Sequence, residues 1–356
     1  MSYSLSPPTK ISGTFVASTS NEGMRWFMQP KLNKRRKLLG RVSDTDMHLF
    51  RVFCTVADCG GFSAAQGQLG VGRSTISRQI SHLETRLGYM LCYRGRSGFV
   101  LTQHGEQALA LIRAFLSTTE QFMADMAAIN DDFSGRINLA IMDYSFSDIR
   151  SPVLPAIREF RTLAPRVEIN LTVESPGTIE RGILDGSFHL GIFPAYRHLD
   201  ELVYFDLYDE KVALYAGVSH PLLEALDKDP DLSVEKITRH ELVFRGYLEG
   251  EKLLKIKQQF RRGPTVFQTE AVAALIQAGA YLGFLPKHAA SEELVSIRPD
   301  IFEYSAPICV AVSRSRRGSV VTNAFLERLT NTATAQAKKR SVARKRTEQF
   351  DNSDLS

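Results

Sequence analysis

Six polar side chains recur along residues 73–82 in a pattern that could read the edge of a nucleic-acid duplex. An arginine guanidinium can donate two hydrogen bonds to guanine, and serine or threonine hydroxyls can contact bases or phosphates. Between them, apolar residues recur at steps of four, three and four, the period of one buried helical face: Ile76, Ile80, Leu83 and Leu87. The pattern predicts a helix that offers DNA the following residues: Arg73, Ser74, Thr75, Ser77, Arg78 and His82.

The chain before this segment has the residues needed to hold such a helix in place. Ser43 or Asp44 can cap a first helix, and Gly60-Gly61 ends it because glycine accepts the left-handed conformation. Residues 63–66 form a capping-box pattern that predicts the start of a short second helix. The glycine-bearing turn 69–72 leads into the third helix, so the three helices have the order of a helix-turn-helix.

A small β-hairpin, or wing, is predicted after Gly88 over residues 90–101. Its basic residues Arg94 and Arg96 are candidate contacts to the DNA backbone. Residues 44–102 therefore form a candidate winged helix-turn-helix domain. The alternative is a small helical subdomain whose arginines are simply solvated, because three amphipathic helices occur in many proteins.

The string at 62–109 closely resembles the DNA-binding segment of LysR-type transcriptional regulators. The chain departs from that family where Gly72-Arg73 replaces a usual Ser-Gln, which weakens the cap of the third helix and changes the residue expected to read a base. Gly67 within the second helix and Cys92 in place of a usual Phe are further departures. The resemblance implies a sequence-specific transcription regulator that binds double-stranded DNA. It rests on residues that recur in the family at this spacing: Ala64, Ala65, Leu69, Ser77, Ile80, Leu83, Glu84, Leu87, Gly88, Leu91, Arg94, Leu101, Thr102 and Gly105.

Residues 103–131 contain no proline and, after Gly105, no glycine, which predicts one long helix. We interpret it as a linker and dimerisation helix, because a two-fold dimer presents two recognition helices to a roughly palindromic operator. The family resemblance implies the same homodimer, with further assembly to a homotetramer. The alternative is an amphipathic helix packed on its own domain. The expected coiled-coil seam, widened by Phe115, Phe122 and Ile129, consists of Leu109, Ile112, Leu116, Thr119, Met123 and Met126.

Residues 134–330 alternate strand-like and helical stretches, which predicts open α/β sheets. Their length suits two lobes of about 100 residues each. This half is similar to the regulatory domain of LysR-type proteins, which shares its fold with type 2 periplasmic binding proteins. The predicted architecture is therefore an α-helical winged helix-turn-helix, a long dimerisation helix and a two-lobed α/β domain. The expected elements are strands at 136–142, 167–173, 188–193, 202–207 and 211–217, a helix at 176–186, and a strand, helix and strand within 266–286.

Ligands of open α/β sheets bind beyond the carboxyl ends of the strands, near the N-termini of helices. We therefore expect a small-molecule effector among the loops that follow the predicted strands. Arg245 is the cation suited to a carboxylate partner. Each candidate could instead be a loop cap or a packing residue. The candidates are Tyr144, Ser145, Ser175, Thr178, Pro194, Phe244, Arg245 and Thr269.

The net charge of +5 conceals two basic ends around an acidic centre. Residues 1–43 hold eight Lys or Arg and one acidic residue, residues 331–356 hold six and three, and residues 103–330 have a net charge of −7. Such asymmetry suggests that only part of the chain faces a polyanion. We interpret 1–43 and 331–356 as disordered basic extensions, with a start at Met28 or Met47 as an alternative for the first.

Several other classes of protein fit the sequence poorly. The four cysteines lack CxxC spacing, and no secretory signal or run of 18 apolar residues occurs, which favours a cytoplasmic location without membrane contact. A thiol redox sensor would need two cysteines in 134–330, where only Cys309 lies. No phosphate loop, nucleophile elbow or metal-ligand cluster favours an enzyme, a cofactor or a bound metal. The alternatives are a DNA-binding regulator without an effector and an α/β enzyme, and RNA polymerase is a candidate further partner.

Overall fold

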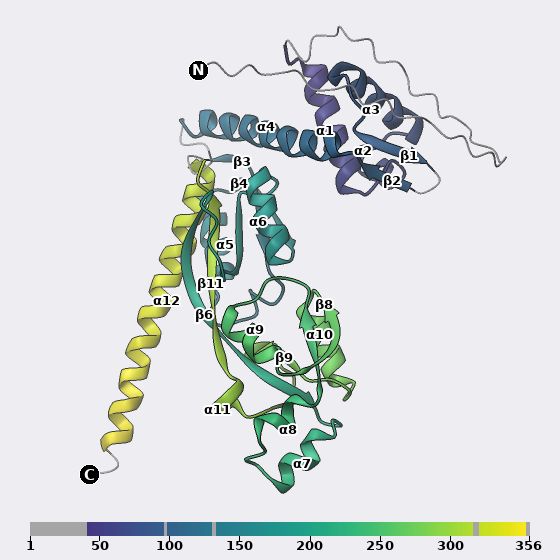
Figure 1. Cartoon of the computed structure of the whole chain (residues 1–356). Helices are drawn as coiled ribbons and strands as arrows, with labels where there is room; N and C mark the ends of the chain where they lie inside the picture. Colours follow the sequence, from purple (N-terminus) through teal and green to yellow (C-terminus); the bar gives the residue numbers. More distant parts are fainter. Residues whose placement is uncertain (1–40, 96–97, 130–132, 316–319, 354–356) are drawn as a thin grey trace, which may run out of the picture.

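The computed structural model describes residues 41–95, 98–129, 133–315 and 320–353 of the chain. Its N-terminal unit holds three helices and an antiparallel hairpin, as the sequence predicts. The predicted wing residue Arg96 and the predicted N-terminal extension up to residue 40 lie outside the described residues. In Figure 1 the elements of this unit are α1 (Asp44–Asp58), α2 (Ala65–Leu69), α3 (Arg73–Leu87), β1 (Cys92–Gly95) and β2 (Gly98–Leu101).

The first helix begins at the predicted cap. The Ser43 hydroxyl accepts a hydrogen bond from the Asp46 amide, and the Asp46 carboxylate accepts one from the Ser43 amide at 2.9 Å. The second helix does not begin as predicted, because Ala64 is its N-cap and no side chain caps it. The side-chain amide of Gln66 instead donates a hydrogen bond to the Ser63 carbonyl at 3.2 Å. The capping-box prediction for 63–66 is therefore wrong.

Helix α4 (Gln103–Ala128) leaves the N-terminal unit as one long rod (Figure 1). Its first half packs on α1, where Leu109, Ile112 and Leu116 join the core of the helix-turn-helix. The predicted seam is therefore wrong over its first half, since these three side chains are buried within one chain. The second half leaves its large apolar side chains exposed, including Phe122 and Met126.

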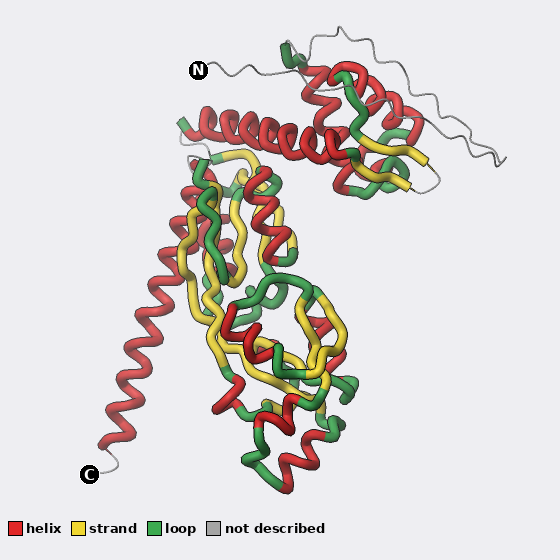
Figure 2. Tube along the Cα trace, in the orientation of Figure 1, coloured by secondary structure: helices red, strands yellow, loops and turns green. Residues whose placement is uncertain are grey.

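The first lobe is a three-layered α/β unit. Its parallel strands are β3 (Ser134–Ile141), β4 (Arg166–Val173) and β5 (Leu190–Pro194). Side chains of β3 alternate between two cores, one beneath α5 (Val153–Leu163) and α12 (Val320–Ser353), the other beneath α6 (Pro176–Asp185). Figure 2 shows these helices on the two faces of the sheet.

Two long antiparallel strands, β6 (Leu202–Gly217) and β11 (Tyr304–Ser313), cross from the first lobe into the second. The sequence predicts two strands at 202–207 and 211–217, but β6 is continuous. Residues 208–210 continue the pairing with β11, and a register shift at Ile308/Cys309 absorbs the irregularity. This pair of strands connects the two lobes.

The second lobe is built around the far ends of these strands. Its core includes Leu214, Leu242, Phe284 and Phe302. Strands β9 and β10 pair with β6, and β7 pairs in parallel with β8. The elements are α7 (Leu222–Lys228), α8 (Val234–Thr238), β7 (Glu241–Arg245), α9 (Glu251–Lys257), β8 (Arg261–Val266), α10 (Thr269–Gln277), β9 (Gly283–Pro286), the 3-10 helix Lys287–Ala289, β10 (Leu294–Ser296) and α11 (Pro299–Phe302).

The predicted disordered tail at 331–356 is wrong for most of its length, because α12 extends to Ser353. Its first turns pack on the first lobe, where Phe325 meets Phe160 edge to face at 5.2 Å between ring centroids. Beyond Ala333 the segment is rich in Ala, Gln, Lys and Arg and has no Gly or Pro, so its residues favour continuation of the helix. Within the described residues, no helix is long and apolar enough to cross a membrane.

Candidate DNA interface and effector cleft

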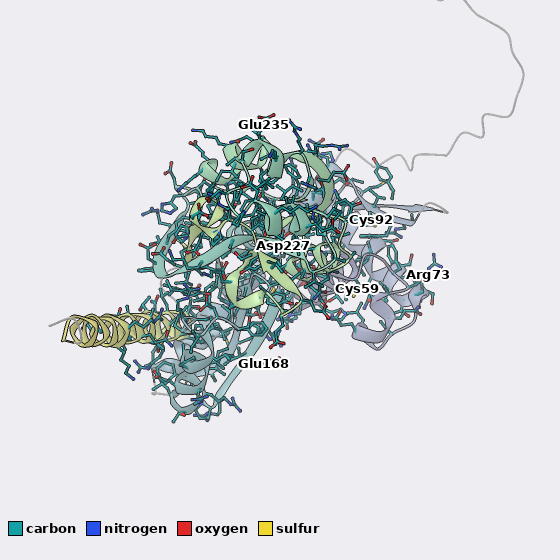
Figure 3. All side chains as sticks on the ribbon, turned by 90° about the horizontal axis from the view of Figure 1, so that it is seen from below. Cys59, Arg73, Cys92, Glu168, Asp227 and Glu235 are labelled. Carbon is teal, nitrogen blue, oxygen red and sulfur yellow. The ribbon has the colours of Figure 1, made fainter. Side chains whose placement is uncertain are left out.

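Within the described residues, the predicted DNA-contacting face of α3 is open to solvent except at Ser77, whose hydroxyl accepts a hydrogen bond from Arg94. Ile76, Ile80 and Leu83 are completely buried against α1 and α2, which orients the opposite side outward. Arg73, Ser74, Arg78 and His82 are exposed, while Thr75 and Ser77 are half-buried. Arg73 lies at the outer edge of the molecule (Figure 3). The six residues therefore share one accessible surface at the start and middle of α3.

Gln66 supplies a cap to α3 that the sequence did not predict. Gly72, the N-cap residue, has no side chain to offer, but the Gln66 Oε1 accepts a hydrogen bond from the Arg73 amide at 3.0 Å. One glutamine thus ties α2 to the first turn of α3. Gln66, six positions before Gly72, therefore supplies the cap that a serine usually provides at this position in LysR-type proteins.

The wing residue Arg94 is already engaged within the domain. Its guanidinium donates to the hydroxyls of Ser77 and Ser81 at 3.2 and 2.7 Å and pairs with Glu84 at 2.5 Å. It also lies over the Phe62 ring, 5.3 Å from the centroid. These contacts brace β1 against α3, so Arg94 positions the wing. Its predicted contact to the DNA backbone stays a prediction.

A continuous apolar stripe runs along the outer side of α4. Successive members are four, seven, four and three residues apart, which places them on one face of the helix. Each has an exposed fraction of at least 40%, and Phe115 also packs edge to face on Phe50 of α1, with the ring centroids 6.0 Å apart. We call this surface the α4 stripe: Leu111, Phe115, Phe122, Met126 and Ile129.

Between the two lobes lies a hollow of about 360 Å³, the candidate effector cleft. Three predicted effector residues line it, namely Ser175, Thr178 and Pro194, from the carboxyl ends of β4 and β5 and the start of α6. The Ser175 and Thr178 hydroxyls are 3.0 Å apart. The second lobe contributes Tyr247, and burial raises the pKa of its phenol to about 12.

Two further predicted residues, Arg245 and Thr269, meet Asp143 beside the cleft, and we call these three residues the lobe bridge. The Asp143 carboxylate accepts hydrogen bonds from the amide of Thr269 and from its hydroxyl, the latter at 2.9 Å. Arg245 Nη2 donates to the same hydroxyl at 2.9 Å. Asp143 was missed as a site residue, although its position directly after a strand is the signal that selected its neighbours.

The remaining predicted effector residues do not line this hollow. Phe244 packs on the core of the second lobe, because successive side chains of β7 point to opposite faces and Arg245 takes the side of the cleft. Tyr144 has a left-handed backbone, with φ of 62°, and its carbonyl lies 3.1 Å from His288 Nε2. Ser145 is completely buried, and its carbonyl accepts from the Tyr208 hydroxyl at 3.1 Å.

A cluster of titratable groups next to these residues was not predicted. Ligand atoms of Asp148, Glu210 and His288 lie within 4.8 Å of one another. Burial, followed by the nearby Asp148 carboxylate, raises the pKa of Glu210 to about 7, although Arg150 and Arg245 oppose the shift. The three residues lie 62 to 140 positions apart, on a loop, a crossing strand and a 3-10 helix, so no local sequence motif predicts the cluster.

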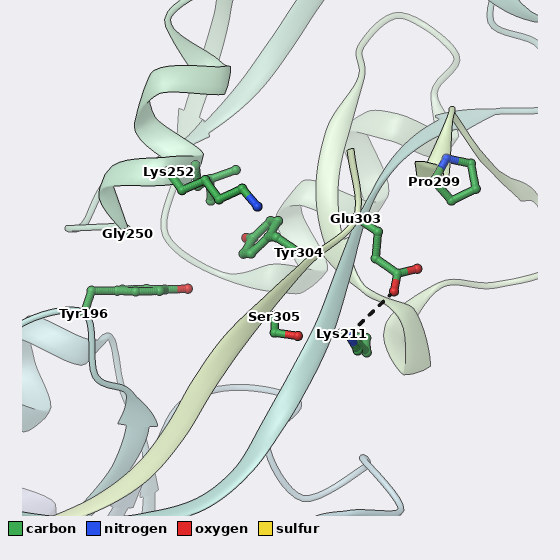
Figure 4. Close-up of a pocket in the computed structure, with 9 residues that line it drawn as sticks. Tyr196, Lys211, Gly250, Lys252, Pro299, Glu303, Tyr304 and Ser305 are labelled. Carbon is green, nitrogen blue, oxygen red and sulfur yellow. Dashed lines mark ion pairs between the residues drawn. The ribbon is translucent and has the colours of Figure 1, made fainter. Parts of the chain in front are cut away.

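A second hollow, of about 650 Å³, shares Tyr196 with the first (Figure 4). Tyr304 and Ser305 of β11 and Lys252 of α9 contribute to its walls. Lys211 also lines it and faces Glu303 across 3.9 Å. No sequence pattern indicates this hollow, because its residues come from four separate elements and the loops beside them.

Comparison with known proteins places both halves in one family. Residues 47–106 match the bacterial regulatory helix-turn-helix protein model of the lysR family, and residues 130–334 match the LysR substrate binding domain. The chain is 33% identical over 298 residues to the HTH-type transcriptional activator BauR of Pseudomonas aeruginosa, covering 82% of this chain and 97% of that protein. It is 26% identical over 264 residues to the probable HTH-type transcriptional regulator LrrA of Synechococcus elongatus, covering 72% and 85%.

Solved structures agree on the fold. The chain is similar to the LysR family regulator CbnR, with a TM-score of 0.54 at 19% identity, over 81% of this chain and 99% of that one. A structure of full-length CbnR complexed with its target DNA gives a TM-score of 0.53 at 20% identity, over 80% and 99%. The relatives are transcription regulators rather than enzymes. The chain therefore belongs to the LysR family of transcriptional regulators, with a helix-turn-helix DNA-binding domain and a LysR substrate-binding domain.

Proposed function

We propose that this regulator binds its operator through α3 and that a small effector held between the lobes controls the binding. The lobe bridge is the observation that carries the second part. It joins a loop of the first lobe to α10 of the second through the hydrogen bonds between Asp143 and Thr269, which any change in lobe closure must alter, and Arg245 of β7 donates to the same Thr269 hydroxyl. A ligand that favours one closure state shifts the population of the whole molecule.

On the DNA side, Arg73, Ser74, Thr75, Ser77, Arg78 and His82 are the proposed contacts, with Arg94 and Arg96 in the wing. A homodimer formed through α4 presents two copies of α3 to a roughly palindromic site. Assembly of dimers into a tetramer would extend the contact to a second half-site pair. Cations on the DNA-facing surface release counterions from the duplex, so affinity should fall steeply with salt.

On the effector side, Arg245 is the proposed anchor for a carboxylate. Its Nη2 is held by Thr269, whereas its buried Nη1 has no hydrogen-bond partner among the described residues. A guanidinium binds carboxylates through paired parallel hydrogen bonds, and a buried unpaired donor is costly. Ser175, Thr178 and Pro194 would form the opposite wall, with Tyr144 and Ser145 beside them.

The test is a titration of small carboxylates against operator binding. Duplexes selected by the protein from a random pool supply the operator, and fluorescence anisotropy reports affinity. A carboxylate that shifts wild-type affinity should lose its effect in Arg245→Ala and Thr269→Ala. Arg239→Ala, which removes an exposed arginine of the second lobe, is the matched control and should respond normally. Equal responses in the wild type and all three variants would show that Arg245 is not part of the site. If no carboxylate changes the operator affinity of the wild type, the result would favour DNA binding without an effector.

A further inference from the structure

Four buried polar atoms between the lobes have no hydrogen-bond partner among the described residues, although the last of them lies 3.4 Å from Asp148 Oδ2: Ser145 Oγ, Glu210 Oε1, Arg245 Nη1 and His288 Nδ1. Buried polar groups in native proteins are nearly always paired, so a group of orphans in one place needs an explanation. The four come from both lobes and from the strand that crosses between them. Separation of the lobes would open this region to solvent.

Glu210 is the most anomalous of them. It lies on β6 with an exposed fraction of 2%, and no cation of the described residues pairs with it within 4 Å. The neighbouring Asp148 carboxylate is already matched, because Arg150 Nε donates to it at 2.9 Å and the same guanidinium forms an ion pair with it. An unmatched carboxylate in the interior calls for a proton or a positive charge.

The surroundings of Glu210 define which charge fits. The loop after β3 brings Asp143, Asp148 and Arg150, β7 brings Arg245, and the 3-10 helix after β9 brings His288. Tyr208, two residues earlier on β6, binds the carbonyl of Ser145. With His288 counted as neutral, two arginines face three carboxylates, so one positive charge balances the group. A divalent metal ion would leave an excess charge beside Arg150, which disfavours it.

Arg245 has the opposite deficiency, since its Nη1 is an unpaired donor in the same interior. Building on the proposed function, we propose that Glu210 binds a primary ammonium group of the effector while Arg245 binds its carboxylate. The effector is then a small amino acid or a similar zwitterion. The Ser145 hydroxyl supplies a further hydrogen bond, and His288, whose Nε2 faces the Tyr144 carbonyl at 3.1 Å, closes the site from the second lobe.

Release of a proton on ligand binding would distinguish a Glu210 that binds ammonium from one that only packs in the interior. Burial keeps Glu210 partly protonated near neutral pH, because its pKa is raised to about 7. An incoming ammonium favours the carboxylate, so the Glu210 proton leaves to the buffer as the ammonium binds. Calorimetry in two buffers of different ionisation enthalpy measures this release directly.

The experiment pairs compounds that differ in one group. Linear amino acids of two to six carbons, with the amine at the far end, are compared with the same carboxylic acids lacking the amine. On the wild-type dimer we expect at least one amino acid to bind 10- to 100-fold tighter than its partner, with proton release. Glu210→Gln should abolish both the preference and the release, whereas Glu235→Gln, at an exposed glutamate of α8, should keep them.

The outcomes separate the two proposals. Equal binding of both compound series, or a preference that survives Glu210→Gln, overturns the ammonium site and leaves the carboxylate effector standing. No binding of either series to the wild type overturns both. Cobalt(II) absorption bands that appear with the wild type and vanish in Glu210→Gln and His288→Ala would replace the ammonium by a metal ion.

Discussion

Arg113 of α4 donates a hydrogen bond from Nη1 to Asp185 Oδ2 at 3.1 Å, joining the linker helix to the last residue of α6. The same guanidinium pairs with Asp58 at the end of α1. The opposite end of α6 carries Thr178, which lines the candidate effector cleft. One short helix therefore connects the cleft with the helix that positions the DNA-binding domain. A helix moves as a rigid body, so ligand contacts at its first turn can change the contact between Asp185 and Arg113.

Removing this contact should uncouple the effector from DNA. Asp185→Asn keeps the shape of the side chain but removes the charge that Arg113 meets. We expect the effector-dependent change in operator affinity to shrink about 5- to 10-fold, a coupling of about 1 kcal/mol, while calorimetric affinity for the effector stays the same. The control is Glu168→Gln, which changes an exposed glutamate of β4 that pairs with Arg136 of β3, and this variant should respond fully. An unchanged response in Asp185→Asn would exclude α6 as the connection.

The face of α3 should divide into residues that specify sequence and residues that only attract phosphate. Arg73→Ala and Arg78→Ala should each weaken binding to the selected operator by about 1–3 kcal/mol if the guanidinium reads a base. A residue that contacts phosphate should instead weaken all duplexes alike and lower the salt slope by about one. Anisotropy titrations at several salt concentrations, on the operator and on a scrambled duplex, distinguish the two roles. Thr85→Ala, on an exposed residue whose hydroxyl binds the Ser81 carbonyl, is the control. Full affinity in both arginine variants would place the interface elsewhere.

The helix-turn-helix could be predicted from the sequence because its signals are local. Ile76, Ile80 and Leu83 follow the helical period, and that period alone decides which side of α3 is buried. The cleft was only partly predictable. Thr178 lies in the first turn of the helix after β4 and Arg245 is the last residue of β7, both near the strand ends where ligands bind, whereas Glu210 lies in the middle of a strand that the sequence suggested would be broken. Its role depends on tertiary neighbours from other elements.

The α4 seam shows the limit of periodicity more sharply. Leu109, Ile112 and Leu116 have the spacing of a coiled coil, but α1 of the same chain covers them. The pattern shows that the helix has an apolar face, but it does not show whether the same chain or a second subunit covers that face. The apolar stripe that stays exposed is displaced around the helix, and its most exposed members are Ile129 and Leu111.

Charge on the α4 stripe should separate the subunits. Phe122→Glu introduces a carboxylate at a side chain that is 60% exposed in the single chain, so the monomer should fold normally. In the dimer this carboxylate would be buried in an apolar seam, where an unpaired charge costs several kcal/mol. Sedimentation velocity should show monomers at concentrations where the wild type is dimeric, and operator affinity should fall with it. Glu120→Gln, at an exposed neighbouring position, should leave the dimer intact. A dimeric Phe122→Glu protein would show that another surface joins the subunits.

The raised pKa of Glu210 predicts how stability depends on pH in the absence of an effector. The native state holds this proton up to about pH 7, whereas the unfolded chain releases it near the ordinary value of 4.5. Between these values the native state binds more protons, so the free energy of unfolding falls as the pH rises and the loss is complete above pH 8. The full shift corresponds to about 3 kcal/mol.

Glu210→Gln removes this titration while keeping the shape of the side chain. Denaturant unfolding should therefore give similar stabilities for the variant and the wild type near pH 4.5, and a variant more stable by up to about 3 kcal/mol at pH 8. Asp206→Asn, at an exposed carboxylate of the same strand, is the control and should follow the wild type across the range. A constant difference between Glu210→Gln and the wild type at every pH would mean that Glu210 is ionised throughout and already has a cation in the native protein.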